Sequence, residues 1–366
     1  MRVALITYST KPRGGVVHTL NLAEALAAEG LDVTIWSLAR QGDTGFFRAV
    51  DPAVTVRLLR FADRPGESVT ERIVRSIDTL RDAFTPDVYD IVHAQDCISA
   101  NAVGSCIRTI HHLDEFTTPI LVECHEKAVV EPYARICVSA AVATEVTAGW
   151  GLQPTVIPNG VRADRFIAAA AATDRGHRHA GLGRYVLAVG GIEPRKGTID
   201  LLEAHHLVRQ HDRNLQLVIA GGETLFDYRD YRARFDQRCD ELGWRPVILG
   251  AVPDDELPAI MAGAEVFAFP STKEGFGLAA MEALAAGRPV VARDLPVLRE
   301  VFGDTVRYAS TVEGLAEALQ DAVGDTGRSA AAGRALAESM TWKAAACAHI
   351  AFYTAHPRPT GAMMSG

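Results

Sequence analysis

The sequence lacks the features that mark several classes of protein. Its 366 residues include six cysteines, at positions 97, 106, 124, 137, 239 and 347, and none of them forms a C-x-x-C pair or a Cys/His metal-ligand spacing. We therefore expect reduced, mostly buried thiols rather than disulfides or zinc ligands. There is no D-x-D metal motif, no apolar run long enough to span a membrane and no signal-peptide pattern. These absences predict a cytoplasmic protein that needs no metal, with peripheral membrane contact left open.

Positive charge is also scarce. The chain has 37 Lys and Arg residues against 45 Asp and Glu residues, for a formal net charge of −8. Proteins that bind nucleic acids need a basic face against the phosphate backbone, so a nucleic acid is not an expected partner. Any phosphate group must instead be held by a few local residues.

The order of apolar runs and helix-forming stretches predicts an α/β fold. Residues 3–36 read as a strand, a loop, a helix with a stripe of apolar residues, and a second strand, which is the first crossover of a doubly wound domain. The length suits two such Rossmann-like domains, each large enough to bury its own core. Residues 167–184 mix Ala, Gly and charge, as is typical of a linker.

Residues 269–298 carry the strongest functional pattern, in which a buried strand leads into a glycine loop, a helix and another strand. Gly275 and Gly277 let the backbone bend close to a ligand. The amides from Gly275 to Ala279, through Phe276, Gly277 and Leu278, open the helix, where unpaired N–H groups and the helix dipole favour an anion. The loop is therefore predicted to bind a phosphate group.

Two glutamates flank this loop. Glu274 follows the strand, where a carboxylate can accept hydrogen bonds from sugar hydroxyls. Glu282 lies beside the apolar stripe of its helix and needs a hydrogen-bond donor, which a ribose diol would supply. Solvated helix-end carboxylates are the alternative. A glycosidase pair is disfavoured, because eight residues at ~1.5 Å each span roughly 12 Å, beyond the ~5–9.5 Å that such pairs require.

The segment PSTKEGFGLAAMEALAAGRPVVA (270–292) resembles the EGFG and E-x7-E signature of family 4 retaining glycosyltransferases of the GT-B fold. YDIVHAQD, RTIHHLDEF and VIPNGVRADRF resemble further family segments in the same order. The resemblance implies two Rossmann-like domains facing each other across a cleft. The domains are predicted at 1–168 for the acceptor and 184–340 for the donor, with a hinge at 169–183, a helix at 341–356 that crosses back to the first domain, and a disordered tail at 357–366.

The resemblance also assigns residues in the first domain. Gly14 and Gly15 begin a GG-x-x-H pattern that ends at His18 and is similar to a glycine-histidine pattern of the family, which implies a loop near the acceptor and the donor diphosphate. An ordinary tight turn is the alternative. His111 aligns with the family histidine that reaches the transferred sugar and is predicted to be catalytic by bonding a sugar hydroxyl. A loop histidine with ordinary partners is the alternative.

In the second domain, Arg195 and Lys196 follow a buried strand, and two cations beside a glycine loop suit a pyrophosphate. The resemblance assigns Lys196 to the donor phosphates, with Lys196 and Glu274 counted among the catalytic residues. Gly191 stands where the family usually has an arginine. Either Arg195 substitutes for that arginine, or part of the charge stabilisation is lost. Val252 lies in a turn that the resemblance implies near the nucleobase.

These observations predict a metal-independent retaining glycosyltransferase that needs no cofactor. It would move a hexosyl group from a UDP- or GDP-linked sugar to an acceptor that is a small molecule, a glycan or a lipid. Without a metal, main-chain amides and Lys196 would stabilise the departing diphosphate. Two alternatives remain at this point. One is a non-catalytic nucleotide-sugar-binding protein, and the other is a nicotinamide-dependent oxidoreductase, which the incomplete glycine fingerprint at Gly14 and Gly15 disfavours.

Overall fold

The computed structural model divides the chain into two compact units. Unit 1 comprises Met1–Gly160 and Trp342–Gly366, and unit 2 comprises Val161–Thr341. Each unit contains a parallel sheet, which confirms the predicted α/β class. The structure describes residues 1–40, 42–113, 116, 118–172, 180–221, 228–325 and 328–359.

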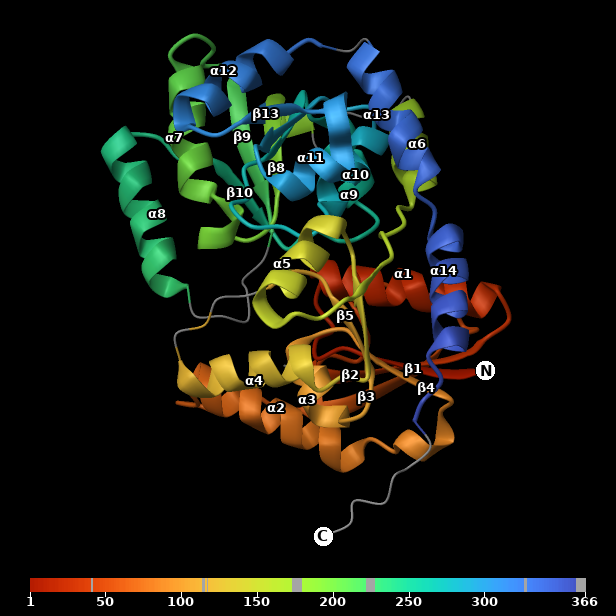
Figure 1. Ribbon diagram of the computed structural model, residues 1–366. Coiled ribbons are helices and arrows are strands. Elements are labelled where there is room, and N and C mark those ends of the chain that lie inside the picture. Colours follow the sequence, from red (N-terminus) through yellow and green to blue (C-terminus); the bar gives the residue numbers. More distant parts are fainter. Residues whose placement is uncertain are drawn as a thin grey trace. The chain divides into compact units, whose positions relative to one another are not determined.

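Unit 1 is built on a parallel sheet with the described strand order β3-β2-β1-β4-β5-β6-β7 (Figure 1). The strand β1 lies between β2 and β4, with Val3 opposite Val33 on one side and Ile91 on the other. Its run of apolar residues is fully buried, as expected for a strand covered on both faces. The strands are β1 Arg2–Ile6, β2 Asp32–Arg40, β3 Thr55–Phe61, β4 Ile91–Ala94, β5 Ile107–Ile110, β6 Ala134–Cys137 and β7 Thr155–Val156.

Helices cover both faces of this sheet. Figure 1 shows α2, α3 and α4 in a row along one face, while α1 and the C-terminal helix α14 pack side by side along the other. Local sequence sets where helices begin: the Ser68 hydroxyl accepts the Glu71 amide at the start of α2, and the Asp96 carboxylate accepts the Ser99 amide in α3. The helices are α1 Gly14–Ala28, α2 Val69–Ala83, η1 Pro86–Val88, α3 Cys97–Val103, α4 Pro119–Val130, α5 Ala140–Trp150 and α14 Trp342–Ala355.

Unit 2 has a second parallel sheet, with the described strand order β10-β9-β8-β11-β12-β13. The strand β8 lies between β9 and β11. From β8 the chain adds β9 and β10 on one side of the sheet, and then β11, β12 and β13 on the other. This order reverses between β8 and β11, which makes that pair the topological switch point of the sheet. The strands are β8 Arg184–Val189, β9 Leu215–Ala220, β10 Val247–Gly250, β11 Val266–Phe269, β12 Val290–Arg293 and β13 Arg307–Ala309.

The helices of unit 2 form two groups. Apolar residues of α7, α8 and α12 form one buried cluster with β8, β9, β11 and β12, and α6, α9, α10 and α13 pack against one another (Figure 1). The helices are α6 Ala163–Ala171, η2 Ala180–Leu182, η3 Pro194–Lys196, α7 Thr198–Arg209, α8 Arg229–Leu242, α9 Leu257–Gly263, α10 Leu278–Ala285, α11 Pro296–Phe302, η4 Gly303–Thr305, α12 Val312–Ala322 and α13 Arg328–Ser339.

The boundary between the units differs from the prediction. The chain divides after Gly160, and residue 168 lies inside α6, a helix that packs on α9 and α10 within unit 2. Residues 167–171 of the stretch that suggested a linker belong to α6, whose Phe166 and Ala170 are buried in unit 2. Of the predicted hinge at 169–183, residues 173–179 lie outside the described part of the chain, as do residues 360–366 of the predicted tail. The helix α14 belongs to unit 1.

Candidate functional site

The residues predicted to bind the donor phosphates gather at the switch point of unit 2. The loop after β8 contains Gly191, Arg195 and Lys196, and the loop after β11 contains Glu274 and the glycine turn. Because β8 and β11 are adjacent parallel strands, both loops leave the carboxyl edge of the sheet at the same place. Open α/β sheets bind ligands at this edge.

The structure brings Lys196, Arg195 and Glu274 into direct contact. The Lys196 Nζ donates a hydrogen bond to the Glu274 Oε1 at 2.6 Å, and an Arg195 guanidinium nitrogen donates to the same oxygen at 3.1 Å. Arg195 also donates to the Lys273 carbonyl oxygen at 3.3 Å. One carboxylate oxygen of Glu274 therefore accepts hydrogen bonds from two cations. Arg195 supplies a second positive charge beside Lys196, where Gly191 has no side chain to do so.

Backbone and side-chain bonds hold the two loops together. The Thr272 amide donates to the Arg195 carbonyl oxygen at 2.8 Å, which joins the two loops. Arg293, at the end of β12, donates to the Pro270 carbonyl oxygen at 2.9 Å and to the Asp200 carboxylate at 2.5 Å. These contacts fix the loop that carries Glu274 relative to the first turn of α7.

The glycine turn after Glu274 adopts a conformation that requires glycine. Gly277 has φ +97°, and a Cβ at this position would lie 2.9 Å from the Phe302 Cζ. Gly277 is also the N-cap of α10, so the amides of Leu278 and Ala279 belong to its first turn and cannot bond within the helix. The Phe276 side chain is buried, and Gly275 is buried beside it, so these two residues can offer a ligand only backbone groups.

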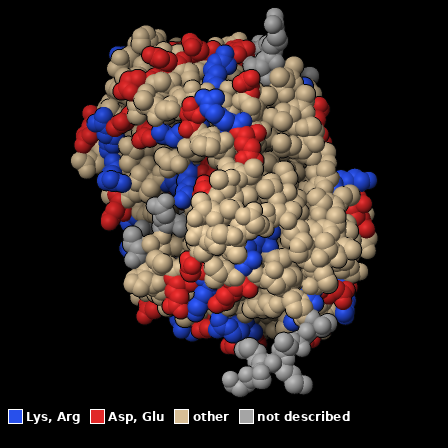
Figure 2. Space-filling model, in the orientation of Figure 1, with Lys and Arg blue, Asp and Glu red and all other residues tan. Residues whose placement is uncertain are grey.

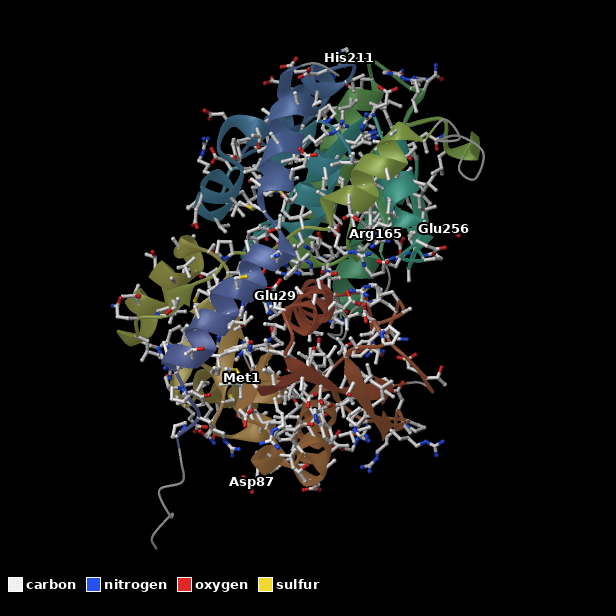
Figure 3. All side chains as sticks on the ribbon, turned by 90° about the vertical axis from the view of Figure 1, so that its right-hand side faces the viewer. Met1, Glu29, Asp87, Arg165, His211 and Glu256 are labelled. Carbon is white, nitrogen blue, oxygen red and sulfur yellow. The ribbon has the colours of Figure 1, made fainter. Side chains whose placement is uncertain are left out.

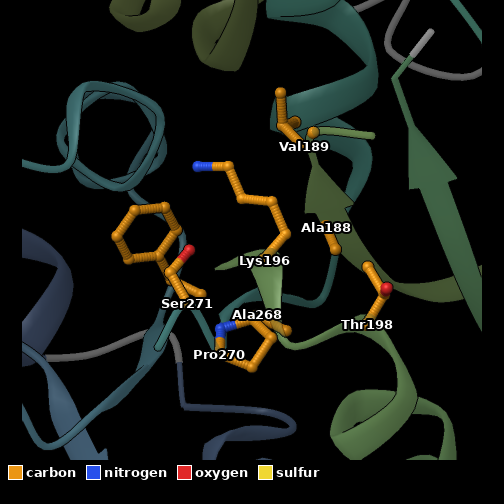
Figure 4. Close-up of a pocket in the computed structure, with 9 residues that line it drawn as sticks. Ala188, Val189, Lys196, Thr198, Ala268, Pro270 and Ser271 are labelled. Atoms are coloured by element: carbon orange, nitrogen blue, oxygen red, sulfur yellow. The ribbon is translucent and has the colours of Figure 1, made fainter. Parts of the chain in front are cut away.

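A small pocket opens between the ends of β8 and β11. It is lined by Lys196, Thr198 and Ser271 and by apolar parts of both strands (Figure 4). Figure 4 shows the Lys196 side chain extending between Val189 and Ser271. The Ser271 hydroxyl is buried and has no hydrogen-bond partner among the described residues, so it can bond a ligand. Neither the glycine pattern nor the charge pattern indicates Ser271, although its place between Pro270 and Glu274 puts it on the same loop.

Val252 lies in the loop after β10, at the same carboxyl edge of the sheet, and is half-buried. The strand β10 is separated from β8 by β9, so Val252 is two strands away from Lys196. The proximity of Val252 to the nucleobase therefore stays a prediction.

Glu282 lies one turn into α10 and is half-buried. Burial raises the pKa of its carboxyl to about 8, against the opposing effect of Arg165. Arg165, labelled in Figure 3, is 2.8 Å from the Asp254 carboxylate, so its charge is already matched. No hydrogen bond to the Glu282 side chain occurs among the described residues. A ligand hydroxyl, such as the predicted ribose diol, could therefore donate to this carboxyl.

In unit 1, Gly15 and His111 are neighbours. A Cβ on Gly15 would lie 3.5 Å from the His111 Cδ2, so the first turn of α1 packs against the imidazole that follows β5. The ring of His18 meets that of His111 edge to face, with centroids 4.7 Å apart. His18 Nδ1 is 2.8 Å from the Asn159 Oδ1. Gly14 has open space around its Cβ position.

Four buried or half-buried histidines form a cluster in unit 1. His349 of α14 lies 6.1 Å from His18 and 5.8 Å from His93 between ring centroids. His93 bonds the Tyr353 hydroxyl at 2.8 Å and the Thr109 hydroxyl at 2.6 Å. Burial lowers the pKa of His18 to about 3 and holds the pKa of His111 well below 6.5. His111 is therefore neutral near pH 7 and can bond a hydroxyl without carrying charge.

Among the described residues, no group of His, Cys, Asp and Glu side chains has the arrangement of a metal site. Figure 2 shows acidic and basic side chains intermixed on the visible face. No helix in the described ranges has the length and apolar character to cross a membrane.

Two family models match the chain, one in each half. The model described as Glycosyltransferase Family 4 matches residues 12–165, and the model described as Glycosyl transferases group 1 matches residues 172–337. The matched ranges contain the glycine pairs, Lys196 and both glutamates.

Curated relatives match over nearly the whole length. A D-inositol 3-phosphate glycosyltransferase from Corynebacterium aurimucosum is 28% identical, with 94% of each chain covered. A phosphatidyl-myo-inositol mannosyltransferase from Mycobacterium tuberculosis is also 28% identical, again with 94% of each chain covered.

Solved structures share the fold. Sucrose-phosphate synthase from Thermosynechococcus elongatus has a TM-score of 0.77 at 21% identity, covering 97% of this chain and 98% of the other. HepE from Anabaena in complex with UDP-glucose has a TM-score of 0.72 at 19% identity, covering 97% and 100%. These solved structures confirm the predicted GT-B fold. The two family matches, one in each half of the chain, confirm the resemblance to family 4 and support the glycosyltransferase class.

Proposed function

We propose that the protein is a retaining glycosyltransferase that moves a hexosyl group from a UDP- or GDP-linked sugar to an acceptor. The observation that carries the proposal is the contact of Lys196 and Arg195 with Glu274, beside the N-terminus of α10. Two cations, a set of backbone amides and one carboxylate match the parts of a sugar diphosphate. The solved HepE complex with UDP-glucose supports a nucleotide-sugar donor for a chain of this fold.

In this proposal, the donor diphosphate binds the Lys196 ammonium, the Arg195 guanidinium and the first amides of α10. The sugar hydroxyls donate to Glu274, and the ribose diol donates to Glu282. As the glycosidic bond to the diphosphate breaks, negative charge grows on the leaving oxygen, and these fixed cations and amides stabilise it without a metal ion. His111 bonds a sugar hydroxyl as a neutral imidazole. No protein nucleophile is assigned.

The alternative of a non-catalytic nucleotide-sugar-binding protein rests on Gly191, because glycine lacks the positive charge of the arginine that the family usually has at this position. Arg195 lies against the same carboxylate oxygen as Lys196, so two cations are available at the proposed diphosphate site. This second cation favours catalysis over simple binding. The nicotinamide alternative finds no support in either matched family.

The proposal is tested with a panel of UDP- and GDP-linked hexoses and a library of acceptors, with products identified by mass spectrometry. We expect one nucleotide to raise the melting temperature, product to form in the presence of EDTA, and NMR of the product to show the donor's anomeric configuration. Lys196→Ala and Glu274→Ala should each lower transfer by more than about tenfold with the fold intact. Unchanged turnover in both variants contradicts the site assignment, and an inverted product contradicts retention.

A further inference from the structure

Glu274 is the acceptor for both cations of the proposed diphosphate site. The exposed fractions of the Glu274, Lys196 and Arg195 side chains are 11%, 17% and 28%, so this triad is largely shielded from water. Arg195 also lies 3.7 Å from the Glu193 carboxylate. Charges in such a setting interact more strongly than on an open surface, because less solvent screens them.

A diphosphate and the Glu274 carboxylate compete for the same donors. The Lys196 ammonium carries three N–H groups, and at 2.6 Å one of them is committed to Glu274. A phosphate group that takes these hydrogen bonds weakens those of Glu274, and a shielded carboxylate that loses two cationic donors is disfavoured. The Glu274 carboxylate therefore lowers the affinity of the site for a diphosphate that carries no sugar.

An intact nucleotide sugar changes this balance, because it brings hydroxyl groups with it. These hydroxyls donate to the carboxylate as the diphosphate takes over the cations, so no charged group is left without a partner. A nucleoside diphosphate released by transfer brings no sugar hydroxyls and carries one more negative charge near Glu274.

We propose that Glu274 determines specificity between the intact donor and the nucleoside diphosphate product, by acting as an internal anion that competes with the diphosphate for Lys196 and Arg195 and is compensated by the sugar hydroxyls of the donor. The inference rests on the proposed function of this site and adds a consequence: the carboxylate weakens product binding and thereby promotes product release.

The test compares Glu274→Gln with the wild type by isothermal titration with inorganic pyrophosphate, UDP and GDP. Glutamine keeps the shape of the side chain but removes the competing charge. We expect pyrophosphate and the accepted nucleoside diphosphate to bind about tenfold more tightly to the variant, because Lys196 and Arg195 no longer neutralise an internal carboxylate. Transfer should slow at the same time, and product inhibition should strengthen.

Glu265→Gln is the matched control. Glu265 pairs with Arg184 at 2.6 Å within unit 2, and the substitution changes the net charge by the same amount outside the site. Its pyrophosphate affinity should stay within about twofold of the wild type, because the lost charge is remote and screened. Equal gains in both variants point to net charge alone and overturn the inference.

Other outcomes separate this inference from the proposed function. Should Glu274→Gln bind pyrophosphate no more tightly than the wild type, the inference is wrong while the donor site stands. If pyrophosphate, UDP and GDP all fail to bind either protein, the donor site is wrong and the inference falls with it. In the wild type, a nucleoside diphosphate that binds more tightly than its nucleotide sugar overturns the inference even if the variant does not fold.

Discussion

The His18 Nδ1 and the Asn159 Oδ1 lie 2.8 Å apart in the interior of unit 1, although 141 residues separate them in the chain. The amide oxygen can only accept, so His18 carries its proton on Nδ1. This hydrogen bond fixes both the tautomer and the ring that meets His111 edge to face.

Asn159→Ala should therefore destabilise unit 1. The substitution leaves a buried N–H group without its acceptor, and we expect the free energy of unfolding to fall by about 1–3 kcal/mol, as measured by urea denaturation. Asn159→Asp provides the comparison, because an aspartate would still accept the hydrogen bond and would raise the pKa of His18. An alanine variant as stable as the wild type is incompatible with this role for the pair.

Acid should destabilise the protein through its buried histidines. Burial lowers the pKa of His18 to about 3, and lowers that of His205 and His349 to about 4. Their ordinary value is 6.5, so between pH 6.5 and 4 the unfolded chain binds protons that the folded chain does not. Their contribution to stability is fully present above pH 6.5 and is lost as the pH falls.

The measurement is the free energy of unfolding at pH 7 and pH 5, compared between the wild type and His205→Gln. Glutamine does not titrate, so the loss of stability between the two pH values should be smaller in the variant. Equal losses would show that His205 does not contribute to acid sensitivity.

Glu282 should act in the opposite direction. Burial raises the pKa of its carboxyl from 4.5 to about 8, so the folded chain keeps a proton that the unfolded chain releases. Stability from this group is present below pH 4.5 and is lost as the pH rises towards 8. Glu282→Gln should therefore melt at a higher temperature than the wild type at pH 8 and close to it at pH 5. A difference that does not depend on pH is evidence against a raised pKa.

Gly277→Ala should damage the donor loop. The φ of +97° disfavours any residue with a side chain, and the added methyl group would lie 2.9 Å from Phe302. We expect a loss of more than about 1 kcal/mol in the free energy of unfolding, together with weaker nucleotide binding. Gly149→Ala is the control, because Gly149 lies in α5 with open space at its Cβ position. A helical alanine there should be neutral or stabilise by roughly 0.5–1 kcal/mol.

Local sequence determined the elements and the residue types of the site. The apolar runs gave buried parallel strands, and the glycine turn placed Glu274 before the first amides of α10, because backbone conformation and periodicity act over a few residues. The place of Glu282 beside an apolar stripe also followed from the local sequence, and burial raises the pKa of its carboxyl to about 8.

Contacts between distant segments were decided only by the tertiary structure. Sheet order brings Lys196 to Glu274 across 78 residues, and the packing of α14 on α1 brings His349 to the histidine cluster. The alanine-rich sequence of α6 suggested a linker because small residues give no clear apolar stripe. Which of them are buried depends on the surface of unit 2 against which the helix packs. Short-range preferences determine which segments form helices and strands. The contact of two cations with one Glu274 oxygen instead depends on β8 and β11 lying side by side, and strand order is a property of the whole packed sheet.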